Sequence, residues 1–174
     1  MKGSAFLRGR KKASLMVILT LVIAIAFIVF PEETQGDLAG PYPVTRVVDG
    51  DTIVVTISGE ENKVRLIGVD TPESVHPDES QNIPYGKISS DFTLNTLEGK
   101  LVYLEYDVEP QDQYGRTLAY VWLDDMMFNK TLLTEGHAVL ATYPPNVRYV
   151  DEFTVLQTQA RNDGKGLWSD TQYE

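Results

Sequence analysis

Three short runs of β-branched residues, separated by only a few residues each, most constrain how this chain can fold. They cover residues 44–48, 52–57 and 63–69. β-Branched side chains favour extended strands, and connections this short join antiparallel neighbours. The segment therefore predicts a three-stranded antiparallel meander.

The residues after the meander alternate between predicted helices and two further strands. Residues 70–86 contain three prolines and many polar side chains, so we expect a long loop there. The predicted elements that follow are helices over 87–100, 129–138 and 150–166 and strands over 101–108 and 117–123. Five strands with a helix between the third and the fourth are typical of the OB-fold, a small barrel that commonly binds oligonucleotides or oligosaccharides. We therefore predict an α+β domain, a five-stranded OB-fold β-barrel with about three helices.

Two residues are expected to mark the ends of the helix over 129–138. Asn129 is a plausible N-terminal cap, and Gly136 is expected to end the helix. Asn129 also begins an Asn-Lys-Thr glycosylation sequon.

The first thirty residues form a segment separate from this domain. Residues 13–30 are 18 residues without a charge, the lower end of what spans a bilayer as a helix and longer than the apolar part of most signal peptides. Basic residues precede this run and acidic residues follow it, so the positive-inside rule places the N-terminus in the cytoplasm and the rest outside. We expect 1–30 to be a signal peptide or a transmembrane anchor, 31–42 a linker and 43–170 the domain. The protein is then extracytoplasmic, either attached to the membrane through its N-terminal helix or secreted.

Charge and composition limit which chemistry the domain can carry. The chain has no cysteine and two histidines, which excludes thiolate chemistry and makes a multi-histidine zinc site improbable, so a metal would be held by oxygen. Beyond residue 30 there are 10 basic and 25 acidic residues, a net charge of −15. Charge of this sign repels polyanions at long range and by itself argues against a nucleic-acid partner.

Acidic residues at two strand ends point to a metal site. Asp49 and Gly50 suit a tight turn, but Asp51 begins the next strand, where aspartate is disfavoured. Asp70 ends the third predicted strand, and in an antiparallel meander it lies beside Asp51. Two carboxylates brought together repel each other and call for a cation such as calcium. Glu73 follows within three residues and could orient or deprotonate a water molecule.

Two arginines complete a set suited to attack on a phosphodiester. Arg65 stands five residues before Asp70, and Arg116 follows a Tyr-Gly turn at the start of the last strand. Taken alone, Arg65 reads as a solvent-facing strand residue. Together with the acids, the guanidinium groups could stabilise the charge that develops on phosphorus.

These motifs resemble the staphylococcal nuclease-like (thermonuclease) family. The resemblance is carried by VVDGDTIVV at 47–55, VRLIGVDTPES at 64–74, YGRTLAYVW at 114–122 and the closing GLW at 166–168. It implies an OB-fold barrel with three helices that cleaves DNA and RNA with calcium and leaves 3′-phosphate ends.

The resemblance also implies a role for individual residues. Asp51 and Asp70 match the calcium carboxylates, and the backbone carbonyl of Thr71 is expected as a further ligand. Glu73 matches the residue proposed as general base or water positioner. Arg65 and Arg116 match the arginines at the reacting phosphate. Tyr114 and Tyr143 align with aromatic residues that line the nucleotide pocket.

Two departures from the family pattern concern nucleotide affinity. Gln113 stands where the best-known members have a lysine, and Ala141 or Thr142 stands where they have a second tyrosine. Two other functions stay open on the residues alone: a non-catalytic OB-fold module that binds nucleic acid or protein, and a calcium-stabilised surface domain. For each of the three we expect a monomer.

Overall fold

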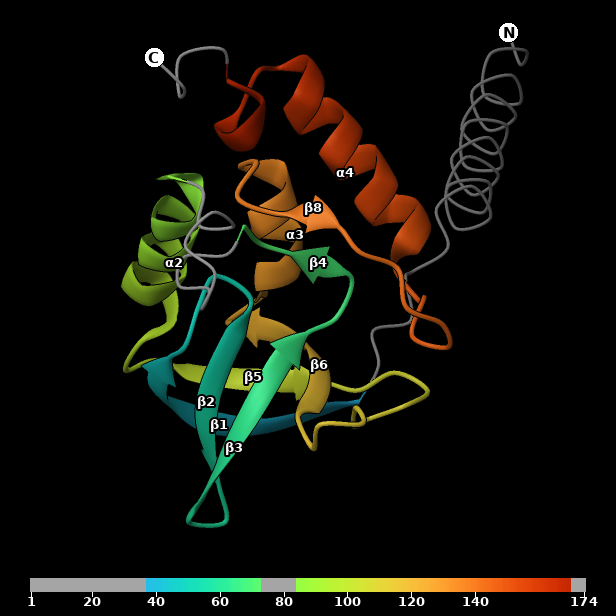
Figure 1. The fold of residues 1–174 in the computed structure, drawn as a ribbon. Helices are drawn as coiled ribbons and strands as arrows, with labels where there is room; N and C mark the ends of the chain where they lie inside the picture. The colour runs from blue at the N-terminus through green and yellow to red at the C-terminus, as the bar shows by residue number, and fades with distance from the viewer. Residues whose placement is uncertain (1–36, 73–83, 170–174) are drawn as a thin grey trace, which may run out of the picture. The chain divides into compact units, whose positions relative to one another are not determined.

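The computed structural model describes residues 37–72 and 84–169 (Figure 1). The larger strands are β1 (Leu38–Val47), β2 (Thr52–Ile57), β3 (Glu60–Leu66), β5 (Leu101–Glu105) and β6 (Thr117–Leu123). Short strands are β4 (Val69–Asp70), β7 (Met126–Met127) and β8 (Val139–Leu140). The helices are α2 (Pro84–Leu97), α3 (Phe128–Thr134), α4 (Val150–Asn162) and the short 3₁₀ helix η2 (Gly166–Trp168).

The five larger strands close into a barrel. The hydrogen-bonded order is β3-β2-β1-β5-β6, and β3 also pairs with β6 in parallel, which completes the ring. The meander β1-β2-β3 is antiparallel, with Thr52 opposite Arg65. Buried aliphatic residues from all five strands fill the interior: Val44, Ile53, Val64, Leu104 and Val121 are each at most 1% exposed. The predicted five-stranded OB-fold barrel is confirmed.

The first strand is longer than the sequence suggested. We expected it over 44–48 and placed 31–42 in a linker, but residues 38–42 form the first half of β1 and pair with β5. Gly40 and Pro41 interrupt the register of this pairing between Ala39 and Tyr42. Gly40 and Pro41 therefore form an irregularity within a strand, because pairing with β5 continues on both sides of them.

The third predicted strand, over 63–69, is divided in two. β3 ends at Leu66 and β4 begins at Val69, so the chain turns at Ile67 and Gly68. Gly68 has φ +79°, and a Cβ there would lie 2.7 Å from a ring carbon of Phe153 in α4. Close packing of α4 thus requires glycine at this corner, and the corner sets the direction in which Asp70 leaves the barrel.

The helices cover one end of the barrel, and α3 lies between the barrel and α4 (Figure 1). α2 begins three residues earlier than expected, at a proline, which suits the first turn of a helix because its missing N–H needs no partner there. Gly99 and Gly136 follow α2 and α3 with φ of +73° and +72°, as expected of helix-ending glycines.

Asn129 is neither a helix cap nor an accessible glycosylation site. The residue at the N-cap position of α3 is Met127, and Asn129 is fully buried. Its side-chain oxygen accepts the N–H of Val121 at 2.9 Å, and its amide nitrogen donates to the carbonyl of Ile67 at 2.8 Å. Asn129 therefore ties α3 to β6 and to the corner between β3 and β4.

Replacing Asn129 with alanine is expected to lower the free energy of unfolding by about 2–4 kcal/mol, because two buried backbone groups lose their partners. Urea denaturation of the full chain measures this. Asn95→Ala, on the exposed side of α2, is the matched control and should change stability by at most about 0.5 kcal/mol. Equal stability of the two variants would show that the hydrogen bonds of Asn129 to Val121 and Ile67 do not stabilise the fold.

The N-terminal segment 1–30 and residues 31–36 of the predicted linker lie outside the described residues. Among the helices that the structure does describe, none is both long and apolar enough to cross a membrane.

Candidate active site

The turn between β1 and β2 brings two acids to one end of the barrel. Asp49 closes the turn, as expected, because its side chain accepts the N–H of Asp51 at 3.1 Å. Asp51 then points inward and is 1% exposed. Burial raises the pKa of Asp49, although the positive charge of Arg65 and hydrogen bonds from Thr52 oppose this.

Thr71 holds the carboxylate of Asp51. Its backbone N–H donates to Asp51 Oδ2 at 2.7 Å and its hydroxyl donates to the same oxygen at 3.0 Å. Gly50 allows this approach, since a Cβ at residue 50 would lie 2.6 Å from the Thr71 hydroxyl oxygen. The hydroxyl of Thr93 in α2 donates to the carbonyl of Gly50 at 2.7 Å and anchors the turn from behind.

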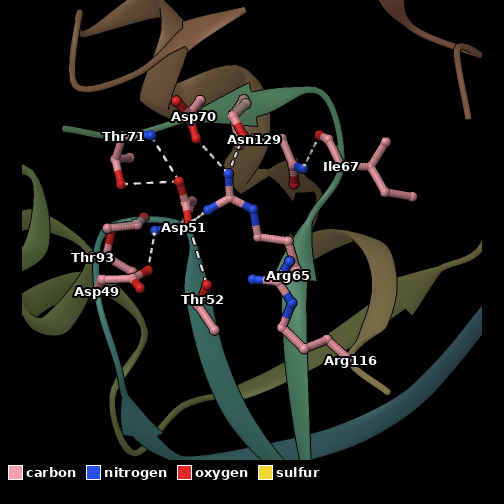
Figure 2. A network of polar contacts seen from close by, with 12 residues as sticks. Asp49, Asp51, Thr52, Arg65, Ile67, Asp70, Thr71, Thr93, Arg116 and Asn129 are labelled. Carbon is pink, nitrogen blue, oxygen red and sulfur yellow. Dashed lines mark hydrogen bonds and ion pairs between the residues drawn. The ribbon is translucent and has the colours of Figure 1, made fainter. Parts of the chain in front are cut away.

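Arg65 lies between the two acids that were expected to meet. Figure 2 shows its guanidinium group directed at Asp51 on one side and Asp70 on the other. The contact to Asp70 Oδ1 is 2.6 Å, and a further bond to the carbonyl of Val69 is 3.3 Å. The strand pairing thus brings Asp51 and Asp70 to one cationic group, as the meander predicted. The side chain of Arg65 is only 18% exposed, so the solvent-facing interpretation of this residue is wrong.

The oxygen donors of this site suit a hard cation. Asp51 and Asp70 converge on one positive group from different strands, and carboxylate oxygens are the ligands that calcium prefers. In the structure the positive group between them is the guanidinium of Arg65. Within the described ranges no three acids or histidines are grouped closely enough to hold a metal alone. Glu73, the third expected acid, belongs to residues 73–83, outside the described residues.

A cleft of about 630 Å³ opens beside this site. It is lined by five of the residues singled out from the sequence: Arg65, Asp70, Tyr114, Arg116 and Tyr143. Tyr114 and Tyr143 are 76% and 69% exposed, so both aromatic side chains are accessible to a ligand. Gln113 also lines the cleft. The position at which we expected a lysine from the family pattern therefore lies at the site itself. Arginines with exposed aromatic rings suit a ligand that carries both a phosphate and a base.

Arg116 is held rigidly at the cleft by Asp112, a residue that the sequence did not single out. Arg116 Nε donates to Asp112 Oδ2 at 2.6 Å, and the N–H groups of Tyr114 and Arg116 both donate to Asp112 Oδ1 at 2.9 Å. Burial would raise the pKa of Asp112, but these hydrogen bonds outweigh it and hold the pKa below its usual value. The carboxylate therefore stays charged near neutral pH and fixes the guanidinium, which lies 5.6 Å from the Tyr114 ring.

Two supporting residues, Asp112 and Thr93, were missed. Thr93 carries no pattern in the sequence, because a threonine in a helix is common and its partner, Gly50, is brought near by the fold. For Asp112 a usable signal exists: it stands four residues before Arg116 and two before Tyr114, the spacing of an aspartate that hydrogen-bonds the following turn.

Comparison with known proteins finds one matching family and several similar proteins. The sequence profile of the family described as staphylococcal nuclease homologue matches residues 63–170. The chain is 45% identical over 160 residues to the thermonuclease of Staphylococcus intermedius, covering 87% of this chain and 95% of that protein. It is 42% identical over 162 residues to the thermonuclease of Staphylococcus hyicus, with coverage of 89% and 95%. Endonuclease YncB of Bacillus subtilis is 38% identical over 130 residues, which is 74% of this chain and 61% of that protein.

Proposed function

Since the chain belongs to the staphylococcal nuclease-like family, we propose that it is a calcium-dependent nuclease that hydrolyses phosphodiester bonds of DNA and RNA and leaves 3′-phosphate ends. That it is a nuclease is supported by two thermonucleases that it matches over 95% of their length. The observation that carries the proposal is the cleft, where Arg65 and Arg116 lie beside two exposed tyrosines and the acid pair.

In this proposal each of the site residues expected from the sequence has a role in the reaction. Asp51, Asp70 and the backbone carbonyl of Thr71 would hold calcium, which supplies positive charge beside the phosphate. Calcium would replace Arg65 as the partner of the two acids, and Arg65, together with Arg116, would then bind the phosphate and stabilise the charge that develops on its oxygens during attack by water. Glu73 orients or deprotonates that water. Tyr114 and Tyr143 stack against bases and hold the strand across the site.

The acidic net charge of the chain is compatible with this substrate because a bound divalent cation would offset the charge of the cleft, whose lining has two arginines against four acids. Asp112 is neutralised by Arg116, and Arg65 lies between Asp51 and Asp70. A bound divalent cation would add two positive charges there. Long-range repulsion between surface charges also falls as salt rises, since ions screen it.

Cleavage of a 5′-labelled single-stranded DNA oligonucleotide by the full chain tests the proposal. We expect cutting in calcium, none with a chelator, and products that polymerase cannot extend until a phosphatase removes the 3′-phosphate. Glu73→Gln should lower the rate by several orders of magnitude. Binding of the oligonucleotide without cutting would favour the non-catalytic OB-fold module instead. Calcium binding with neither binding nor cutting of the oligonucleotide would favour the calcium-stabilised surface domain.

We also propose that the domain acts outside the cytoplasm, anchored or released by residues 1–30. The support is the uncharged run at 13–30 with basic residues before it and acidic residues after it. Protease treatment of intact cells tests this, because an external domain is digested and a cytoplasmic one is protected.

A further inference from the structure

Two segments of the chain build the wall of the cleft that carries its aromatic rings. The segment 106–116 carries Tyr114 and Arg116, and the segment 141–149 carries Tyr143. The rings are highly exposed, so their own packing does not place them. What holds the two segments against each other therefore decides where the rings stand.

A buried carboxylate lies at the root of the first segment. Glu105, the last residue of β5, is fully buried. It accepts the indole N–H of Trp122 at 2.9 Å, the hydroxyl of Tyr149 at 2.8 Å and a guanidinium N–H of Arg148 at 2.6 Å. A buried charge needs a charged partner, and Arg148 supplies it from the second segment.

Arg148 also reaches the residue two positions further along the first segment. Its backbone N–H donates to Asp107 Oδ2 at 3.1 Å, and its guanidinium lies 3.6 Å from Asp107 Oδ1. Burial would lower the pKa of Arg148, but Glu105 and Asp107 raise it above its ordinary value. Arg148 of segment 141–149 thus bonds Asp107 of segment 106–116 and also Glu105, the residue just before that segment.

A second contact carries this connection toward Tyr143. The side chain of Asn146 accepts the N–H of Glu109 and donates to the carbonyl of Glu109, both at 2.8 Å. The N–H of Asn146 donates to the carbonyl of Tyr143 at 3.2 Å. Two sets of bonds therefore hold segment 141–149 against segment 106–116, one at Arg148 and one at Asn146, two residues apart. The second set continues to the backbone of Tyr143.

We propose that Arg148 is a positioning residue for the substrate strand: it locks segment 141–149 against segment 106–116 and so sets where Tyr143 stands relative to Tyr114 and Arg116. The inference rests on the proposed function and deepens it. Arg148 does not itself line the cleft, so it acts through Tyr143 and not by touching the phosphate.

Arg148→Lys is the variant that tests this, because it keeps a positive charge beside Glu105 while a single ammonium group cannot span both acids. In calcium, the KM for single-stranded DNA is expected to rise about tenfold with kcat within about twofold, the pattern of weakened substrate binding. The Kd of a labelled ten-residue oligothymidylate, measured by anisotropy in chelator, should rise in parallel. Trp122 fluorescence should change as well, since its indole bonds Glu105.

A double-mutant cycle separates positioning from mere support of the fold. If Arg148 acts through Tyr143, then Arg148→Lys should add little to the KM of Tyr143→Ala. Lys165→Gln removes a surface ion pair with Glu135 away from this wall and should leave KM unchanged. An unchanged KM in Arg148→Lys, or full additivity with Tyr143→Ala, would overturn the proposal. If the wild-type chain does not cleave at all, the proposed function has failed instead.

Discussion

Replacing Arg116 with lysine is expected to lower kcat for single-stranded DNA about 10³-fold, the loss typical when one preorganised donor to a developing negative charge is removed. Arg116 Nε donates a hydrogen bond to Asp112 Oδ2 at 2.6 Å. The two terminal nitrogens of the same planar group remain available to a ligand in the cleft, which Arg116 lines. A lysine ammonium is one point charge on a flexible stem. It can pair with Asp112 or approach the phosphate, but it cannot hold both at a fixed geometry.

Initial rates at saturating calcium and substrate measure this effect. Arg46→Lys is the matched control: Arg46 is exposed on β1 outside the cleft lining, and the same exchange there should leave kcat unchanged. Asp112→Asn should give a smaller loss, because the guanidinium remains but its ionic anchor is weakened. A kcat for Arg116→Lys within about tenfold of wild type would show that Arg116 does not contact the reacting phosphate.

The charge of Asp112 also predicts how the loss of kcat in Arg116→Lys depends on pH. Hydrogen bonds hold the pKa of Asp112 below its usual value, so the carboxylate is charged throughout the neutral range and loses its charge only at acidic pH. The difference between wild type and Arg116→Lys should therefore be constant around neutrality.

Local patterns predicted the parts of the site that lie on neighbouring strands. The β-branched runs predicted the meander, and the antiparallel pairing of β2 with β3 brought Asp51 and Asp70 to one place. The closing pair, β3 with β6, joins segments about fifty residues apart and has no local signal. Arg116 stands at the start of β6, so its arrival beside Arg65 depends on that closure.

Other residues stayed unassigned because their partners are distant in the sequence. Arg148 follows a Pro-Pro-Asn-Val stretch that reads as an ordinary polar loop, and its partner Glu105 lies 43 residues earlier. Glu105 itself stands in an alternating strand, where an acid is usually solvated. In the closed barrel Tyr149 and Trp122 cover this end of β5 and bury Glu105. Because a buried carboxylate needs a charged partner, the Glu105–Arg148 ion pair follows from the closed fold and not from the sequence pattern.

Replacing Asp51 with asparagine is expected to remove both the calcium response and part of the fold's stability. Asp51 is buried and accepts hydrogen bonds from the N–H and hydroxyl of Thr71 besides its ion pair with Arg65. Asparagine has one oxygen and an amide that can only donate, so it must turn a donor toward either Thr71 or Arg65. The expected loss in free energy of unfolding is about 3–5 kcal/mol, typical of a broken buried ion pair.

Thermal unfolding with and without calcium separates the two effects. Calcium at one hundred times its Kd should stabilise wild type by about 2.7 kcal/mol, and this gain should vanish in Asp51→Asn. Leu104→Ala is the matched control, because loss of a fully buried leucine in β5 lowers stability by about 2–5 kcal/mol without removing a carboxylate, and this variant should keep the full gain. If Asp51→Asn still gained stability from calcium, the metal would be held elsewhere. The convergence of Asp51 and Asp70 on Arg65 would then be a structural ion-pair network. The proposal of a nuclease would in that case rest only on the two arginines at the cleft and on the similarity to known nucleases.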